Sequence, residues 1–424
     1  MAADSTGRTS ARDAASGTGR TPARDAADGT GRTPAGDGTR AVRAGLPDPV
    51  KHQPALPGPV FAAHFHLPGD ATGPYRYGRD ENPTWTLLER AISELEAPFG
   101  VGGRPGPDAA TAGERADGGP AETLVFASGM AAISATLFSQ LRAGDTVVLP
   151  ADGYQVLPLV REQLTAYGIE VRTAPTAGDA QLDVLDGARL LWIETPSNPG
   201  LDVCDLRRMI DTAHAQGTLV AVDNTLATPL GQRPLELGAD FSVASATKQL
   251  TGHGDVLLGY VSCRDSATAT AVRRWRKIIG AIPGPMEAWL AHRSLATLQL
   301  RADRQCTTAL TVAEALRTRP EVSGLRYPGL PDDPAHPVAA RQMRRFGCVV
   351  SFTLPSREHA ERFLDALTLV DDATSFGGVR STAERRRRWG GDPVPEGFIR
   401  LSVGIEDPDD LVRDILRALD QLTD

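Results

Sequence analysis

The chain alternates short apolar runs with longer segments of helical period from residue 122 onward, and this alternation limits its fold more than any other feature. It is typical of repeated β-α-β units around a mainly parallel sheet, and so predicts an α/β domain. The helical patterns span residues 131–141, 157–167 and 205–216. The predicted strands span residues 123–127, 146–149, 169–172, 190–193, 219–222, 241–244 and 257–262.

The pattern changes after about residue 276, which indicates a second, smaller α+β domain over residues 276–424. It consists of one long helix at 285–316, followed by strands near 349–354 and 398–403. The large domain then covers residues 81–275. It contains a low-complexity insertion at 100–121, rich in Gly, Pro, Ala and Asp, which we expect on the surface.

Residues 1–40 form a repetitive tail, in which Thr-Gly-Arg-Thr recurs every twelve residues, starting at Thr6, Thr18 and Thr30. The three copies hold no large apolar residue, so the tail cannot bury enough surface to offset the entropy of ordering it. We expect the tail to be disordered.

At 424 residues, with 41% hydrophobic and 23% charged residues, the chain has the composition of a globular protein. Its net charge of −8 opposes non-specific binding to nucleic acid. No apolar run approaches the roughly 18 residues of a membrane-spanning helix and there is no signal h-region, so we expect a cytoplasmic protein without membrane contact. Four widely spaced cysteines predict buried thiols, with no metal site and no disulfides: Cys204, Cys263, Cys306 and Cys348.

The ends of the predicted strands are where a ligand is expected, because open α/β sheets bind ligands beyond the carboxyl ends of their strands. Ser128, Gly129 and Met130 follow the first run and open a helix, a place that suits a phosphate, although an ordinary turn also explains them. Gly-x-Gly-x-x-Gly and Gly-x-x-x-x-Gly-Lys loops are missing, which disfavours nicotinamide and nucleoside triphosphate ligands. Tyr154 follows the second run, where it could stack on a planar cofactor or simply line the rim.

Polar residues also follow three of the later runs, at 190–193, 219–222 and 241–244. Asn198 stands between two prolines, where its amide could hydrogen-bond a ligand. Asp223 follows the run at 219–222, and its carboxylate either caps a helix or meets a cationic ligand group. Lys248 comes after the run at 241–244 together with Ser245 and Thr247, an unusual place for a lysine, and lysine amines in such sites form Schiff bases with carbonyl cofactors.

One ligand accounts for all these positions, namely pyridoxal 5'-phosphate (PLP). It requires a lysine for its aldehyde and an acid that keeps its ring nitrogen protonated, so that the ring acts as an electron sink. The phosphate would lie at the Ser128 turn, the ring under Tyr154, the ring hydroxyl near Asn198, the ring nitrogen on Asp223 and the aldehyde on Lys248.

The same residues resemble the Cys/Met-metabolism (trans-sulfuration) family of PLP-dependent enzymes, and most of all its cystathionine γ-lyases and γ-synthases. The resemblance runs from about residue 60 to the C-terminus, and its strongest blocks are residues 77–84, 126–132, 194–199, 222–225, 245–248 and 400–407. It implies the aspartate-aminotransferase-like (type I) fold, with a mainly parallel sheet and a smaller C-terminal α+β domain.

The resemblance also implies roles for single residues. Lys248 would be the Schiff-base lysine and catalytic base, Asp223 the partner of the ring nitrogen, and Tyr154 the stacking and catalytic tyrosine. The phosphate would be held by Gly129, Met130, Ser245 and Thr247.

Two further sets of residues have implied roles. Arg400 would bind the substrate α-carboxylate, with Ser375 beside it. Tyr77 and Arg79 would reach the phosphate of a neighbouring subunit from an N-terminal arm at 41–80, so that the protein would form a homodimer or homotetramer with shared sites.

Two departures from the family pattern affect the substrate. Thr374 stands where these lyases and synthases usually have a glutamate, and Leu159 stands where they usually have an arginine that faces the far end of the substrate. A run of four arginines at 385–388 is normally a solvated face, but near this pocket it could replace the lost arginine.

The predicted reaction is a PLP-dependent γ-elimination on an L-amino acid, with L-cystathionine as the leading substrate and L-cysteine, 2-oxobutanoate and ammonia as products. The alternatives are γ-replacement of an O-acylhomoserine by cysteine, methionine γ-lyase, cystathionine β-lyase, and elimination of a non-sulfur group such as halide. A non-catalytic regulator on the same fold is disfavoured, because it would not need Arg400.

Overall fold

The computed structural model describes residues 35–70, 72–97 and 121–422. Most of the predicted tail, up to residue 34, and the predicted insertion, up to residue 120, lie outside the described residues. The last residues of the predicted tail are helical, because α1 (Asp37–Arg43) begins within it. The Asp37 carboxylate is bound by Arg233 at 2.7 Å and by Arg345 at 2.9 Å, which anchors this helix to the rest of the molecule.

The large sheet has seven strands in the order β1-β7-β6-β5-β4-β2-β3. Only β7 runs antiparallel to its neighbours, so the predicted, mainly parallel sheet is confirmed, with strand ends within two residues of those expected. The strands are β1 (Glu122–Phe126), β2 (Thr146–Pro150), β3 (Glu170–Ala174), β4 (Leu190–Glu194), β5 (Leu219–Asp223), β6 (Phe241–Ala244) and β7 (Gly259–Cys263).

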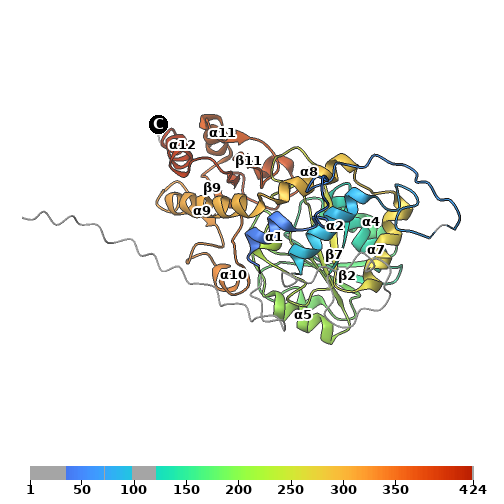
Figure 1. Ribbon diagram of the computed structural model, residues 1–424. Coiled ribbons are helices and arrows are strands. Elements are labelled where there is room, and N and C mark those ends of the chain that lie inside the picture. Colours follow the sequence, from blue (N-terminus) through green and yellow to red (C-terminus); the bar gives the residue numbers. More distant parts are fainter. Residues whose placement is uncertain (1–34, 71, 98–120, 423–424) are drawn as a thin grey trace, which may run out of the picture.

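Helices cover both faces of this sheet (Figure 1). Neighbouring residues of one strand serve opposite faces: Val147 packs with α3, α4 and α7, whereas Val148 packs with α5. Burial on both faces explains why the strands read as continuous apolar runs. The helices of this part are α2 (Pro83–Glu96), α3 (Gly129–Gln140), α4 (Leu157–Ala166), α5 (Leu206–Ala215), α6 (Thr228–Gly231) and α7 (Ser266–Ile279), with a short 3-10 turn η2 (Leu182–Val184).

A second, five-stranded sheet lies at the C-terminal end, in the order β10-β11-β12-β9-β8 and mostly antiparallel. Its apolar core includes Phe352 and Phe363, whose rings meet edge to face. Its elements are α9 (Leu298–Leu316), β8 (Ser323–Arg326), α10 (His336–Gln342), β9 (Val349–Thr353), α11 (Arg357–Ala366), β10 (Asp371–Asp372), β11 (Thr382–Arg385), η3 (Arg386–Trp389), β12 (Phe398–Ser402) and α12 (Pro408–Asp420). The predicted smaller α+β unit is therefore present.

The single long helix predicted at 285–316 is wrong, because the chain breaks it at Ala296 and Thr297 into α8 (Pro285–Leu295) and α9. At the break the Ser294 carbonyl accepts from Thr297 N at 3.2 Å and from Arg301 Nη2 at 2.9 Å. Arg301 Nη1 also binds the Gln249 carbonyl, one residue after Lys248, at 2.6 Å. The predicted domain boundary at residue 276 falls inside α7, and α8 still packs with α2 in the core of the large domain.

In the part of the chain that the structure describes, no helix is both long and apolar enough to span a bilayer, and no group of acidic, His or Cys side chains could hold a metal ion. All four cysteines are free thiols. Cys204, Cys263 and Cys348 are buried as predicted, whereas Cys306 is only half-buried.

Candidate active site

The N-terminus of α3 packs directly against Ser245, the residue that follows β6. A Cβ atom added to Gly129 would lie 2.6 Å from Ser245 Cβ, so only glycine allows this contact. The N–H groups of Gly129 and Met130 belong to the first turn of α3 and are not used within the helix. They and Ser245 are therefore the donors available to an anion here, while the Met130 side chain packs in the core.

Two predicted phosphate-binding hydroxyls are engaged elsewhere. Ser128 Oγ caps α3 by accepting from Ala131 N at 3.1 Å. Thr247 Oγ1 donates to the Leu258 carbonyl at 3.1 Å and accepts from Leu258 N at 2.9 Å, so it fixes the chain near Lys248. Both residues thus lie next to Gly129 or Lys248 in the chain, but their hydroxyls form hydrogen bonds within the protein.

Two buried carboxyl groups lie side by side at the ends of β5 and β4. Asp223 and Glu194 are register partners in the sheet. Thr225 is the only hydrogen-bond partner of Asp223 among the described residues, with N to Oδ1 at 3.0 Å. Burial raises the pKa of Asp223, and burial together with the Asp223 charge raises the pKa of Glu194 well above its usual value.

Glu194 also organises two predicted site residues. Its Oε2 accepts from Tyr154 N at 2.7 Å, and its Oε1 accepts from Asn198 N at 3.0 Å. Sequence reasoning missed this role, since it assigned no function to Glu194. The available signal was its position at a strand end, the same as that of Asp223.

Lys248 donates from Nζ to Ser375 Oγ at 2.8 Å. Its side chain is largely enclosed, and burial, followed by the charge of Arg400, lowers the pKa of Lys248 to about 8. A neutral amine is therefore accessible near physiological pH, as a nucleophile or base requires.

Ser375 has a φ of +79°, a strained value for a residue with a side chain. This conformation lets one residue serve two partners, because its carbonyl accepts from Arg400 Nη2 at 3.1 Å while its hydroxyl accepts from Lys248. Gly377 keeps the same loop close to Lys248: a Cβ there would lie 2.5 Å from Gln249 N.

Arg400 is buried on β12 and faces the end of β4. Its Nη1 donates to Asn198 Oδ1 at 2.8 Å. Arg400 and Lys248 lie over the same ring, since the Arg400 guanidinium carbon is 5.2 Å and Lys248 Nζ is 4.9 Å from the centroid of Phe376. Lys248, Ser375, Asn198 and Arg400 are thus joined by hydrogen bonds into one contiguous group.

Comparison with known proteins identifies the family. The family model of the Cys/Met metabolism PLP-dependent enzymes matches residues 115–420. The chain belongs to this family. A protein of Streptomyces coelicolor with the provisional name cystathionine gamma-lyase is 79% identical over 388 residues, which are 92% of this chain and 94% of that protein. The cystathionine gamma-synthase of Mycobacterium tuberculosis is 36% identical, over 90% of this chain and 96% of its own.

A solved structure agrees in fold. The structure described as a methionine gamma lyase from Micromonospora echinospora has a TM-score of 0.81 and 38% identity, and covers 91% of this chain and 99% of that one. The predicted family, type I fold, PLP dependence and enzyme class are therefore confirmed. The predicted cystathionine γ-lyase and two of its alternatives, the γ-synthase and methionine γ-lyase, match the names of these relatives.

The described residues fit the cofactor of the family. A lysine amine with a lowered pKa, a buried carboxyl with spare capacity and a helix N-terminus that glycine brings against Ser245 are the three features that PLP requires.

Tyr77 and Arg79 do not join this group of residues. Tyr77 is exposed and forms an isolated β-bridge with His64, and the Arg79 guanidinium lies 5.4 Å from the centroid of the Tyr77 ring. No contact of either residue with the other predicted site residues is found in the described chain. Their part of the arm is drawn in blue in Figure 1, between α1 and α2.

The basic run at 385–388 is only partly the solvated face that its composition predicts. Arg387 and Arg388 are exposed, but Arg385 and Arg386 are buried. Arg386 is buried because the buried carboxylates of Glu384 and Asp392 surround it. Arg386 Nη2 reaches Gln155 Oε1, next to Tyr154, at 3.0 Å. Glu384 is a site neighbour that sequence reasoning missed, whereas Arg386 belongs to the run that it considered as a replacement for the lost arginine. Thr374 and Leu159 are both exposed.

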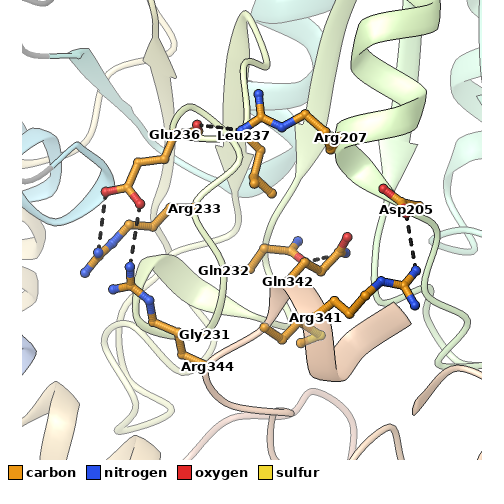
Figure 2. A pocket seen from close by; sticks show the side chains of 11 residues that line it. Asp205, Arg207, Gly231, Gln232, Arg233, Glu236, Leu237, Arg341, Gln342 and Arg344 are labelled. Carbon is orange, nitrogen blue, oxygen red and sulfur yellow. Dashed lines mark hydrogen bonds and ion pairs between the residues drawn. The ribbon is translucent and has the colours of Figure 1, made fainter. Parts of the chain in front are cut away.

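A separate cleft of about 490 Å³ lies between α5, the segment after α6, and α10 (Figure 2). None of the predicted site residues lines it. Three of its arginines are paired with carboxylates: Arg341 with Asp205 at 3.3 Å, and Arg233 and Arg344 with Glu236 at 3.5 and 3.7 Å. The pairs of Arg341 and Arg344 join the two domains, and the cleft is not part of the site.

Proposed function

We propose that the protein catalyses γ-elimination on L-amino acids that carry a leaving group at Cγ. The preferred substrate is L-cystathionine, which yields L-cysteine, 2-oxobutanoate and ammonia. The name of the Streptomyces coelicolor relative, 79% identical, supports this assignment.

The observation that carries the proposal is the link from Arg400 through Ser375 to Lys248. The Ser375 carbonyl accepts from Arg400 at 3.1 Å and its hydroxyl accepts from Lys248 at 2.8 Å. A substrate whose α-carboxylate binds Arg400 therefore has its Cα within reach of the Lys248 amine. This is the arrangement needed to remove a Cα proton from an amino acid.

When PLP is bound, Lys248 would hold it covalently and Asp223 would face its ring nitrogen. Tyr154 would stack on the ring with Asn198 beside it, and the phosphate would be held by Ser128, Gly129, Met130, Ser245 and Thr247. When bound, PLP supplies an electron sink for the pair of electrons left by the departing proton.

The chain's own groups then perform three tasks. Arg400 and Asn198 orient the substrate carboxylate. The Lys248 amine takes the proton at Cα and moves a proton at Cβ, and its pKa of about 8 lets it exist in both protonation states at neutral pH. Phe376 covers both charged groups and limits water.

A second candidate is methionine γ-lyase. Thr374 and Leu159 place no charge where a charged far end of the substrate would need one, and an uncharged methyl thioether does not need it. The Micromonospora echinospora relative has itself been described both as a methionine gamma lyase and as a cystathionine gamma lyase.

We also propose that two or more copies assemble and share their sites, with the 41–80 arm carrying Tyr77 and Arg79 to the neighbour. Large apolar side chains remain exposed on the single chain, and burial against a second copy would remove them from water: Phe61 at 68%, Leu257 at 67% and Ile278 at 64%. Four free thiols suit the reducing cytoplasm, where we place the protein.

The test supplies the purified, PLP-loaded enzyme in turn with L-cystathionine, with L-methionine, and with O-succinylhomoserine plus L-cysteine. Keto acid, ammonia and thiol are measured in each case. We expect 2-oxobutanoate and cysteine from cystathionine at the highest kcat/KM. No turnover of cystathionine overturns the leading assignment, and faster turnover of methionine supports the second candidate.

A further inference from the structure

A buried cluster of four charged side chains lies behind the substrate-binding arginine. Glu384 on β11 and Arg400 on β12 are register partners, and Arg386 and Asp392 complete the cluster. All four are almost fully buried, at 1%, 4%, 3% and 2% exposed respectively. Two arginines balance two carboxylates, so the cluster is neutral. Buried charges persist only when they are paired in this way.

Glu384 is held at both carboxylate oxygens and cannot swing aside. Its Oε1 accepts from Arg400 Nη2 at 2.5 Å and from Arg386 Nη1 at 2.8 Å. Its Oε2 accepts from Trp389 Nε1 at 2.8 Å. Burial alone would raise the pKa of Glu384, but the charges of Arg400 and Arg386 and the hydrogen bonds from Trp389 and Arg386 together outweigh this effect, so the pKa lies below its usual value. Glu384 is therefore a fixed carboxylate.

This fixed partner determines which N–H groups of Arg400 remain for a ligand. A guanidinium has five N–H groups. Nη2 gives its two to Ser375 O and Glu384, and Nη1 gives one to Asn198. Among the described residues, the Nε–H and one Nη1–H have no acceptor, so these two are the donors that Arg400 offers to a carboxylate.

Arg386 connects the same cluster to the other domain. Its Nε donates to Asp392 Oδ2 at 2.8 Å, and its Nη2 donates to Gln155 Oε1 at 3.0 Å. Gln155 follows Tyr154 directly, so Arg386 joins the C-terminal sheet to the loop of the large domain that carries Tyr154. Because its donors are engaged and it is buried, Arg386 does not replace the missing arginine as a direct substrate ligand.

We propose that Glu384 and Arg386 are positioning residues, which hold the Arg400 guanidinium in the orientation that binds the substrate carboxylate and keep the Tyr154 loop beside it. The inference rests on the proposed function only in taking Arg400 as the carboxylate-binding residue. Arg386 has a second effect, since without it two carboxylates would face a single arginine and would repel an incoming carboxylate.

The test measures ligand binding and needs no turnover. The PLP-loaded enzyme is titrated with L-norvaline, which has an α-carboxylate but no leaving group, and with n-butylamine, the same skeleton without the carboxylate. The change in cofactor absorbance gives the dissociation constants. Because neither ligand is eliminated, failure of the proposed reaction does not affect the result.

We expect Glu384→Gln to weaken L-norvaline binding about tenfold or more, with n-butylamine binding changed less than about twofold. Arg386→Lys keeps the charge but loses the fork that reaches three partners, and it should have the same selective effect. Arg387→Gln is the matched control, because Arg387 belongs to the same turn but its side chain is 41% exposed, and we expect it to bind both ligands normally.

Unchanged binding of L-norvaline to Glu384→Gln would overturn the proposal, because Glu384 would then not hold Arg400 in its binding orientation. Tighter binding would also overturn it, because Glu384 would then compete with the substrate for Arg400. Equal weakening of both ligands would also overturn it, since a general loss of structure has that effect. If Glu384→Gln does not retain PLP, Arg386→Lys decides the question alone by the same criteria.

Discussion

The lowered pKa of Lys248 provides the sharpest test of the site. Lys248 Nζ and the Arg400 guanidinium carbon lie 4.9 and 5.2 Å from the centroid of the Phe376 ring, so the two charges are at most about 10 Å apart. At an effective dielectric constant of about 20, unit charges about 10 Å apart interact by about 1.7 kcal/mol. That energy corresponds to about 1.2 pKa units. Removal of the Arg400 charge favours the protonated amine and should raise the pKa of Lys248.

Arg400→Gln should therefore raise the pKa of Lys248 from about 8 to about 9 or above in the cofactor-free protein. The Glu384 charge, no longer opposed by Arg400, shifts the pKa in the same direction. The assay acetylates the protein at a series of pH values and quantifies the Lys248 peptide by mass spectrometry. The midpoint of the rate profile gives the pKa.

Arg413→Gln is the matched control, because Arg413 is exposed on α12 and pairs only with Asp410 among the described residues. It should leave the midpoint at about 8. An Arg400→Gln midpoint equal to that of the wild type, or below it, would refute the reasoning, because burial alone would then account for the pKa of Lys248.

Three other substitutions test the rest of the site. Gly129→Ala places a Cβ 2.6 Å from Ser245 Cβ, so urea unfolding should show a loss of about 1–3 kcal/mol, and wild-type stability would contradict the packing argument. Asp223→Asn removes the charge that faces the cofactor ring and should weaken PLP binding by about 10- to 100-fold in a fluorescence titration; an unchanged affinity would exclude Asp223 from the site. Glu194→Gln tests the carboxyl pair through pH. The raised pKa of Glu194 stabilises the folded protein at low pH, and this stabilisation is lost as pH rises through the folded-state value, with a slope of up to about 1.4 kcal/mol per pH unit. The stability of the wild type relative to Glu194→Gln should therefore fall as the pH rises above about 4.5 in urea titrations, and parallel curves would show that the pKa of Glu194 is not raised.

The sequence predicted the part of the site that the topology of the sheet generates. Parallel strands end at one edge, so a residue directly after an apolar run, such as Tyr154, Asp223 or Lys248, must face the same space. The strands themselves were predictable because burial on both faces makes them continuous apolar runs. The break in the helical segment at 285–316 was not predictable, because the helical period continues through Ala296 and Thr297. The break becomes clear only in the fold, where Arg301 binds the Gln249 and Ser294 carbonyls.

The residues that sequence reasoning missed share a different property, since each acts through a partner that is far away in the chain or on another strand. The role of Glu194 can be recognised only when β4 pairs with β5 and brings it beside Asp223. The role of Glu384 can be recognised only when β11 pairs with β12 and brings it opposite Arg400. A run of arginines reads as a solvated face because an unpaired buried charge is too costly. Glu384 and Asp392 remove that cost for Arg386, although both lie within six residues of it. The useful signal was therefore an acid on each side of the basic run, which indicates that the run contains a buried, paired arginine and is not a solvated face throughout.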